Sequence, residues 1–423
     1  MEYSSDLWWR FAFRGDAPRF LRGLAGASAV VAIAGLIRLL RRVPTAVGLA
    51  PDEDALNRAK AVIARSPDPA ANLALLGDKR LLFSASAAAG SDTDGFVMYA
   101  EQGGSWITMG GPVGPPETRE ELAWAFRTAA EKAEKRAVLY GVPESDLALL
   151  IDLGMTPYKL GEHGVIPLGT FSLDGGSRRG LRKTIRRVDE AGYTLEVLPS
   201  ESVPEMIPEL QRISEAWMDG KAVAEKGFSL GFFNPAYLQN FPVAVVRQVV
   251  DAPVISPDAQ GASSEGAAGK GQIVAFANMW VNDRLSGDAA PGAASKTEAS
   301  IDLMRFDRER APDGVMDYLI TKVILWAQQE GYGRFSLGMA PLSGLEPDGD
   351  ASLAPLWNRA GHLLFRHGEH FYNFQGLRNY KEKFDPVWKP RYLAVPRGRL
   401  DLAGALMDVA TLISGGLGEL IRK

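Results

Sequence analysis

The spacing of apolar residues in the first half of the chain predicts an α/β unit that extends from Pro51 to about Leu168. Short apolar runs, bounded by glycine, proline or charged residues, predict strands at 79–83, 95–100, 105–109, 137–140 and 155–160. Apolar positions at helical spacing predict helices at 117–136 and 144–153. Strands and helices that alternate in this way are typical of a mixed α/β architecture.

A similar order of elements recurs between about Leu195 and Ala394. The pattern predicts helices at 204–219, 234–248, 314–330 and 351–366, and strands at 272–281, 300–306, 334–338 and 391–395. This repeat is one of element order, not of residues, and two α/β units in tandem account for a length of 423 residues. The expected divisions are 1–48 (membrane-proximal), 49–194 (first unit, with a basic helix), 195–397 (second unit, with the active site) and 398–423 (C-terminal helix).

Two segments inside the second unit, 251–270 and 282–296, are rich in Ala, Gly, Ser and Asp. They flank a predicted strand and have the composition of flexible hairpin loops, so we assign them no chemistry.

Composition narrows the possible chemistry. Cysteine is absent, which excludes disulfides and thiolate sites, and the chain has only four histidines. A multi-histidine metal site is therefore disfavoured, and a general base is expected to be a carboxylate. The net charge of −4 excludes a basic nucleic-acid binder as a whole, although a local basic patch can still bind polyanions.

The N-terminus has the composition of a membrane–water interface. Tryptophan, phenylalanine and arginine are mixed within residues 1–19, and 15 mostly apolar residues lie between Arg22 and Arg38. About 20 such residues are needed to span a bilayer, so the run is of marginal length. It is interpreted as a membrane-embedded or interfacial helix, or as a helix buried on the soluble part; a cleaved signal peptide fits least well.

A strongly basic helix is predicted at 178–187. Its cations form two adjacent rows at i, i+4 spacing, opposite the apolar stripe Leu181, Ile185 and Val188. Such a row repels itself unless phosphates lie opposite, so the helix is a candidate site for RNA phosphates or lipid headgroups; a solvated helix is the alternative. The candidate cations are Arg178, Arg179, Arg182, Lys183, Arg186 and Arg187.

A carboxylate lies in an apolar strand at Asp302, and Arg305 follows three residues later. A buried carboxylate is costly unless it is paired or functional. Residues three apart lie on opposite faces of a regular strand, so a β-bulge between them is needed to bring them together. The alternative is a structural buried ion pair.

Two further stretches combine features of a binding site. Residues 335–343 lead from a strand into a turn that ends at Ser343, as at the rim of α/β sites. Residues 374–393 interleave aromatic residues with Arg378, Lys381, Lys389 and Arg391, a mixture suited to a phosphate beside a base or ribose. A plain strand–loop junction and an amphipathic core segment are the respective alternatives.

Taken together, these stretches resemble the C-terminal synthase domain of the multiple peptide resistance factor family, the lysyl- and alanyl-phosphatidylglycerol synthases. The matching segments are LWWRFAFRGDAPRFLR, SRRGLRKTIRR, EKGFSLGFF, DLMR, DGVMDYL, FSLGMAPLSG and FQGLRNYKEKFDPVWKPRYLA. They occur in order over nearly the whole chain.

The resemblance implies a fold of two tandem GNAT-like acyltransferase units, with aminoacyl-tRNA and phosphatidylglycerol meeting in a tunnel. The family's DxxR pair falls on Asp302 and Arg305, its KxR pair on Lys389 and Arg391, and a further acidic residue on Glu369. Two departures are the large flippase domain that usually precedes this part and the two polar inserts. The turn at 308–314 has a single glycine, which argues against acetyl-CoA.

The expected reaction moves an amino acid, favoured by resemblance to be lysine, from aminoacyl-tRNA to the glycerol hydroxyl of phosphatidylglycerol. Because the ester is already activated, no cofactor or metal is expected. The resemblance further implies resistance to cationic antimicrobial peptides and a location at the bacterial cytoplasmic membrane, facing the cytoplasm. The rivals are a Fem-type ligase that acylates a peptidoglycan amine, and a non-catalytic RNA- or lipid-binding module.

Overall fold

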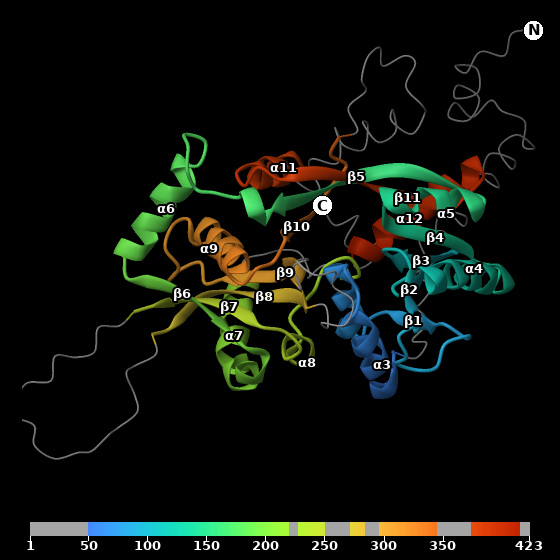
Figure 1. Cartoon of the computed structure of the whole chain (residues 1–423), viewed down its shortest axis with the longest axis horizontal. Coiled ribbons are helices and arrows are strands. Elements are labelled where there is room, and N and C mark those ends of the chain that lie inside the picture. Colours follow the sequence, from blue (N-terminus) through green and yellow to red (C-terminus); the bar gives the residue numbers. More distant parts are fainter. Residues whose placement is uncertain (1–49, 220–226, 250–270, 284–295, 345–373, 415–423) are drawn as a thin grey trace, which may run out of the picture.

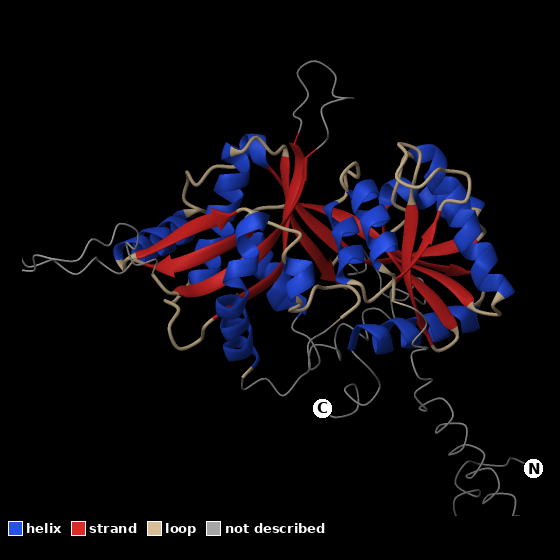
Figure 2. Cartoon of the chain, turned by 90° about the horizontal axis from the view of Figure 1, so that it is seen from below, coloured by secondary structure: helices blue, strands red, loops and turns tan. Residues whose placement is uncertain are grey.

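A computed structural model describes residues 50–219, 227–249, 271–283, 296–344 and 374–414. These residues form a mixed α/β fold around one eleven-stranded sheet with the order β1-β2-β3-β4-β11-β5-β10-β9-β8-β7-β6 (Figure 1). Helices lie on both faces of the twisted sheet (Figure 2). Among the described residues, no helix is both long enough and apolar enough to cross a bilayer.

The first half of the chain builds one end of this sheet. Its helical elements are α3 (Glu53–Ile63), the 3₁₀ helix η1 (Pro69–Leu76), α4 (Pro116–Lys132) and α5 (Leu147–Asp152). Its strands are β1 (Arg80–Phe83), β2 (Phe96–Gln102), β3 (Ser105–Met109), β4 (Arg136–Pro143) and β5 (Met155–Pro167). Asp52 caps α3 by accepting a hydrogen bond from the amide of Ala55, which satisfies a donor that the helix itself leaves free.

The second half builds the other end. Its helices are α6 (Arg179–Glu190), α7 (Val203–Met218), α8 (Pro235–Leu238), α9 (Val315–Gln329), α11 (Phe374–Glu382) and α12 (Arg399–Ser414). Its strands are β6 (Tyr193–Leu198), β7 (Val243–Gln248), β8 (Ile273–Asp283), β9 (Lys296–Phe306), β10 (Arg334–Pro341) and β11 (Val387–Pro396).

The last strand joins the two halves into one sheet. β11 pairs antiparallel with β4 on one side and with β5 on the other, although it follows them by more than 200 residues in the sequence. A strand from the second half is therefore inserted between two strands of the first half, and the sheet continues into the second half where β5 pairs with β10.

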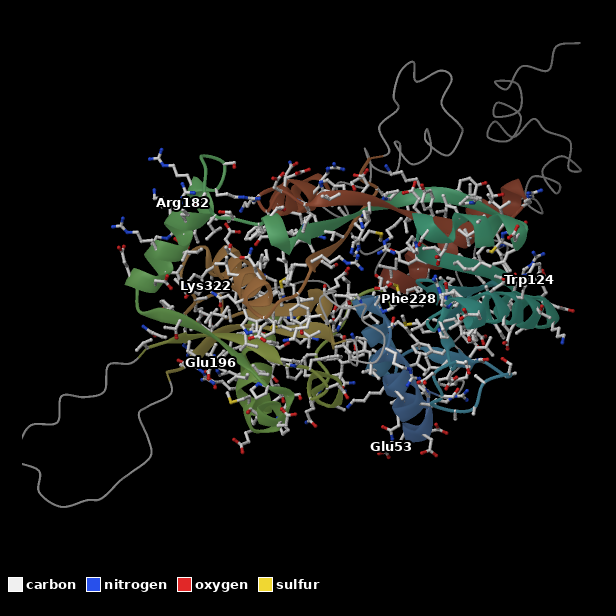
Figure 3. The ribbon with its side chains drawn as sticks, in the orientation of Figure 1. Glu53, Trp124, Arg182, Glu196, Phe228 and Lys322 are labelled. Carbon is white, nitrogen blue, oxygen red and sulfur yellow. The ribbon has the colours of Figure 1, made fainter. Side chains whose placement is uncertain are left out.

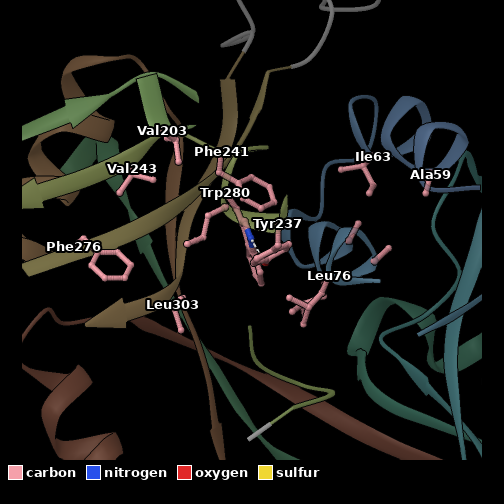
Figure 4. Packing of buried hydrophobic residues seen from close by; sticks show 14 of the residues in the cluster. Ala59, Ile63, Leu76, Val203, Tyr237, Phe241, Val243, Phe276, Trp280 and Leu303 are labelled. Carbon is pink, nitrogen blue, oxygen red and sulfur yellow. Dashed lines mark hydrogen bonds between the residues drawn. The ribbon is translucent and has the colours of Figure 1, made fainter. Parts of the chain in front are cut away.

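Apolar side chains pack in separate clusters on the two faces. On one face of β7–β9, a cluster includes η1, α7 and α8, with Tyr237, Phe276 and Leu303 among its members (Figure 4). On the opposite face, α6 and α9 cover the sheet through residues such as Leu181 and Tyr318. The site described below lies on the face of η1 and α8.

Most sequence-based element predictions are confirmed within a few residues, including the basic helix, the long helix at 314–330 and the strand at 391–395. The predicted helix at 234–248 is wrong: α8 ends at Leu238, and 243–248 is the buried strand β7. Its sequence VAVVRQ is rich in β-branched residues and buried on both faces, so periodicity does not separate strand from helix. Strand β6 and helix α3 were not predicted. The helix at 351–366, the segment at 20–40 and most of the two inserts lie outside the described residues.

Candidate active site

Strand register brings residues from four strands to one face of the sheet. Ser300 of β9 pairs with Ser336 of β10, which pairs with Val165 of β5, and Val165 pairs with Val387 of β11. Because paired residues share a face and side chains alternate along a strand, Asp302, His163 and Lys389 lie on the same face. Arg391, two residues beyond Lys389, extends this row.

The β-bulge expected in β9 is present. Met279 of β8 pairs with Ile301 and Ala277 pairs with Met304, so β9 has one extra residue in this interval. Leu303 packs into the same cluster as Tyr237, and Met304 packs into the cluster on the opposite face. The bulge thus places Asp302 and Arg305 on one face, as the sequence predicted.

The carboxylate of Asp302 is held by two hydrogen bonds. The amide of Gly231 donates to Oδ1 at 2.9 Å, and the hydroxyl of Tyr237 donates to Oδ2 at 2.9 Å. Tyr237 is fully buried and accepts a hydrogen bond of 3.0 Å from Nε1 of Trp280 (Figure 4). The carboxylate is therefore fixed by a chain of donors from outside its own strand.

Burial raises the pKa of the Asp302 carboxyl above its ordinary value. The hydrogen bonds from Gly231 and Tyr237 and the positive charges of Lys79 and Arg305 oppose this rise of the pKa. Lys79 comes from the first half of the chain, is almost completely buried, and binds Asp78 at 2.6 Å. A carboxylate whose protonation depends on competing effects of this kind is typical of functional sites.

Gly231 belongs to a connecting segment, 227–234, that links two apolar clusters. Phe228 packs with β3, β4 and α12, whereas Phe232 and Phe233 pack with η1 and α7 (Figure 3 labels Phe228). Phe228 is buried with a φ of 62°, an uncommon conformation for a bulky residue, and the ammonium of Lys79 lies 5.8 Å from its ring. A Cβ at Gly231 would lie 1.9 Å from Oδ2 of Asp302, so only glycine permits this approach.

The second pair expected from the sequence lies across the same face. Lys389 pairs with His163 and is exposed, and Arg391 pairs with Gly161 and is partly buried. The charge of Arg391 acts on His163 of β5 and on Glu298 of β9, so its positive potential reaches across the site. Phosphate or another anion would find cations here opposite the carboxylate of Asp302.

Other predicted residues lie around the same strands. Lys381 is buried in α11, donates to the carbonyl of Met339 at 2.9 Å, and has its pKa lowered to about 7 by burial. Arg378 bonds the carboxylate of Glu162 and lies over the ring of Trp388. The remaining two predicted residues are Ser343, whose hydroxyl donates to the carbonyl of Ala340 at 2.8 Å, and Glu369, which lies outside the described residues.

The basic helix α6 is amphipathic, with Leu181 and Val188 buried as predicted. Its cations differ in their surroundings. Arg178 is buried and donates to the carbonyls of Lys383 and Phe384. Arg187 is exposed and donates to the carbonyl of Asp313 at 2.6 Å. The other four are also exposed: Arg182 bonds the preceding loop, Arg186 pairs with Glu190, and Arg179 and Lys183 extend to solvent (Figure 3 labels Arg182).

Sequence reasoning missed the residues that hold the site together. Gly231 lies in a segment noted only for its resemblance, and the sequence gives no sign that its amide contacts Asp302. The others, which become neighbours of the site only through sheet register and loop packing, are Lys79, His163, Tyr237, Trp280 and Ser336.

Comparison with known proteins identifies the family to which the chain is related. The family model described as phosphatidylglycerol lysyltransferase, C-terminal, matches residues 60–395. The chain is 32% identical over 329 residues to a phosphatidylglycerol lysyltransferase of Bacillus subtilis, an alignment that covers 78% of this chain and 33% of that relative. A relative of the same name from Staphylococcus aureus is 31% identical over 305 residues, with 71% and 32% covered. The chain therefore spans about a third of the length of these relatives.

Two solved structures are similar over most of the chain. One, from Agrobacterium fabrum, is described as the C-terminal domain of a lysylphosphatidylglycerol synthetase; it is 40% identical, with a TM-score of 0.68, and the match covers 86% of this chain and 98% of that one. The other is L-PGS from Bacillus licheniformis, at 31% identity and a TM-score of 0.65, with 87% and 99% covered. By the family model and by these relatives, the chain belongs to the phosphatidylglycerol lysyltransferase C-terminal family.

Proposed function

We propose that this chain transfers an aminoacyl group, lysyl in particular, from aminoacyl-tRNA to the glycerol hydroxyl of phosphatidylglycerol. The observation that carries the proposal is the shared face on which the held carboxylate of Asp302 lies across from the cations Lys389 and Arg391. A substrate with an ammonium group and a substrate with a phosphate would each find an opposite charge there. The names of the relatives favour lysine and phosphatidylglycerol.

The reaction would be an exchange of esters. The oxygen of the glycerol hydroxyl attacks the carbonyl carbon of the aminoacyl ester, the bond from that carbon to the 3′ oxygen of the tRNA breaks, and the proton of the hydroxyl passes to that 3′ oxygen. The protein has to hold the two substrates, stabilise the oxyanion and assist one proton transfer.

The charges of the site suit these tasks. Asp302 would bind the α-ammonium of the aminoacyl group or act as the base, because its carboxylate is fixed by Gly231 and Tyr237. Arg305, Lys389 and Arg391 would hold phosphates or the developing oxyanion. The six basic residues of 178–187, together with Ser343, Arg378, Lys381 and Glu369, remain candidates for substrate contact, and Arg179 and Lys183 of α6 are exposed toward solvent.

The proposal has three wider parts. Each half of the sheet would be a GNAT-like unit, so that the substrates approach a site made by both. The site would work at the cytoplasmic surface of the bacterial membrane, where phosphatidylglycerol is available, and a flippase domain would be a partner. Lysylation would make the lipid cationic and so reduce the binding of cationic antimicrobial peptides.

The test is transfer of radiolabelled lysine from lysyl-tRNA into the lipid phase of phosphatidylglycerol vesicles. We expect label in the lipid with wild-type protein, and a loss of about a hundredfold or more with Asp302→Asn, because a partly buried charge pair with the substrate would be lost. Asp152→Asn, on the exposed surface of α5, is the matched control and should retain activity. Absence of lipid label from folded wild-type protein would reject the proposal, and label transferred to a peptidoglycan amine would favour a Fem-type ligase.

A further inference from the structure

A serine–histidine pair lies between the two charged groups of the site. Nε2 of His163 in β5 lies 2.8 Å from Oγ of Ser336 in β10, and the amide of Gly338 donates to the same oxygen at 3.2 Å. Ser336 is buried, whereas His163 is partly exposed on the face shared with Asp302 and Lys389.

This pair fixes the imidazole without occupying its second nitrogen. A serine hydroxyl has two lone pairs, and N–H groups of Gly338 and His163 can fill both. In that arrangement Nε2 of His163 carries the proton, and Nδ1 keeps a lone pair on the side of the ring away from Ser336. Of the chain's four histidines, His163 is the one within the described residues. It was not recognised as a site residue from sequence, because only the strand register brings it beside Ser336 and Lys389.

We propose that His163, positioned by Ser336, accepts the proton of the attacking glycerol hydroxyl, while Asp302 binds the α-ammonium of the aminoacyl group. This assignment rests on the proposed function and chooses between the two roles considered for Asp302. Nδ1 takes the proton as the hydroxyl oxygen bonds to the carbonyl carbon, and returns it to the 3′ oxygen of the tRNA as that bond breaks. No other reactant is needed.

The spacing of the strands suits this division of roles. Ser300 and Val165 pair with Ser336 from its two sides. Asp302 lies two residues from Ser300, and His163 lies two residues from Val165, in the same direction along the strands. Their backbones are therefore separated by two strand spacings, roughly 10 Å. The reacting groups would form a path from the carboxylate of Asp302 to Nδ1 of His163. It consists of a hydrogen bond to the ammonium, the bonds from the ammonium nitrogen to the carbonyl carbon, the approach of the attacking oxygen to that carbon, and a hydrogen bond from the hydroxyl to Nδ1, and it is roughly 11 Å long. The separation of the two backbones is therefore similar to the length that one aminoacyl ester and one hydroxyl require, because both side chains project from the same face.

Surrounding cations link the basicity of His163 to substrate binding. Burial, and then the charges of Arg391 and Lys389 from β11, Lys381 from α11 and Arg334 from β10, hold the pKa of His163 well below its ordinary value. Glu162, its neighbour in β5, points to the other face and bonds Lys159 and Arg378. A phosphate bound at Lys389 and Arg391 would offset their charge and raise the pKa of His163, so the base would become effective when the anionic substrate is present.

The experiment compares single-turnover transfer of lysine to phosphatidylglycerol vesicles across pH for wild type, His163→Gln, Ser336→Ala and the control Asp152→Asn. For His163→Gln we expect a loss of about 10²–10⁴-fold and no acid limb assignable to a histidine, because glutamine cannot take the proton. For Ser336→Ala we expect a smaller loss of the transfer rate, and an acid limb of the pH profile that lies at a different pH from that of wild type. Added imidazole should partly restore His163→Ala, which a purely structural role does not explain.

The outcomes separate this inference from the proposed function. If wild type transfers lysine and His163→Gln keeps a rate within threefold of it with the same pH profile, His163 is not the base. If His163→Gln does not fold, an unchanged pH profile of Ser336→Ala together with no rescue of His163→Ala by imidazole refutes the assignment. If folded wild type gives no lipid label, the proposed function fails first, and this inference with it.

Discussion

Gly231 offers a sharp test of how Asp302 is held. A Cβ added there would lie 1.9 Å from Oδ2 and 2.9 Å from Cγ of Asp302, whereas real Cβ atoms stay at least 3.0 Å from their neighbours. The backbone of Gly231 does not adopt a positive φ, so alanine is compatible with the chain conformation itself. Gly231→Ala therefore acts through this one contact and forces the carboxylate and the segment 227–234 apart by about 1 Å.

Two energies follow from that displacement. Overpacking a filled interior costs about 1–3 kcal/mol of folding free energy. Breaking the 2.9 Å bond from the amide of Gly231 to the carboxylate removes an interaction with a charged acceptor, worth about 1.5–3 kcal/mol. If the second amount is lost from substrate positioning, transfer falls by about 10–100-fold, since 1.4 kcal/mol corresponds to tenfold.

The assay is lysine transfer to phosphatidylglycerol across pH, together with denaturant unfolding. The lost amide bond lets the pKa of Asp302 rise further, so more of the carboxyl is protonated at a given acidic pH. The acid limb of activity should move to higher pH. The matched control is Gly227→Ala in the same segment, where an added Cβ meets no atom within 4 Å. It should retain wild-type transfer and stability.

An equal loss of activity in Gly227→Ala and Gly231→Ala would show that the segment, and not the contact with Asp302, is being tested. Wild-type activity and an unshifted acid limb in Gly231→Ala would refute the reasoning more directly, because the amide bond could then be broken without consequence for Asp302.

Two further predictions concern cations. Arg178→Ala should lower the free energy of unfolding by about 1–3 kcal/mol, because it removes the donor to the buried carbonyl of Phe384 and to the partly buried carbonyl of Lys383. Lys183→Ala should leave stability within about 0.5 kcal/mol and weaken binding of tRNA or phosphatidylglycerol vesicles in a salt-dependent way; denaturant melts and binding titrations in increasing KCl distinguish the two. The pKa of Lys381 falls to about 7 in the fold, so the unfolded chain binds more protons than the folded chain between pH 7 and about 10. The free energy of unfolding should therefore rise with pH across that window. Denaturant melts at pH 7 and pH 9 measure this rise, and Lys381→Met should reduce it. If the free energy of unfolding still rises with pH in Lys381→Met, another titratable group causes the rise.

Elements with a strong amphipathic pattern could be predicted from sequence. The basic helix α6 has its apolar stripe at Leu181, Ile185 and Val188, and its boundaries were nearly correct. Strand β7 could not be predicted, because a short run buried on both faces has no alternation that distinguishes strand from helix. The place of β11 between β4 and β5 could not be predicted either, since local sequence contains no information about a pairing partner more than 200 residues away.

The candidate site was predictable only where the local sequence itself is unusual. A carboxylate within an apolar strand is costly, so Asp302 was recognisable, and the need for a bulge followed from its spacing to Arg305. The groups that hold Asp302 were not recognisable: Tyr237 looks like an ordinary core aromatic, and Gly231 like an ordinary loop glycine. The role of Gly231 comes from where the loop 227–234 crosses β9, and that of Tyr237 from the packing of α8 against the same strand.

The position of β11 explains why the site requires both halves of the chain. Lys389 and Arg391 lie on a strand held by β4 and β5 of the first half, and Asp302 lies on β9 of the second. The segment 227–234 crosses between them, with Phe228 packed against β3, β4 and α12 and Phe233 against η1, α7 and β8. Two substrates of different chemistry can therefore approach from different units and meet on one face, and a change in the packing between the units would alter the distance between the charged groups that hold them.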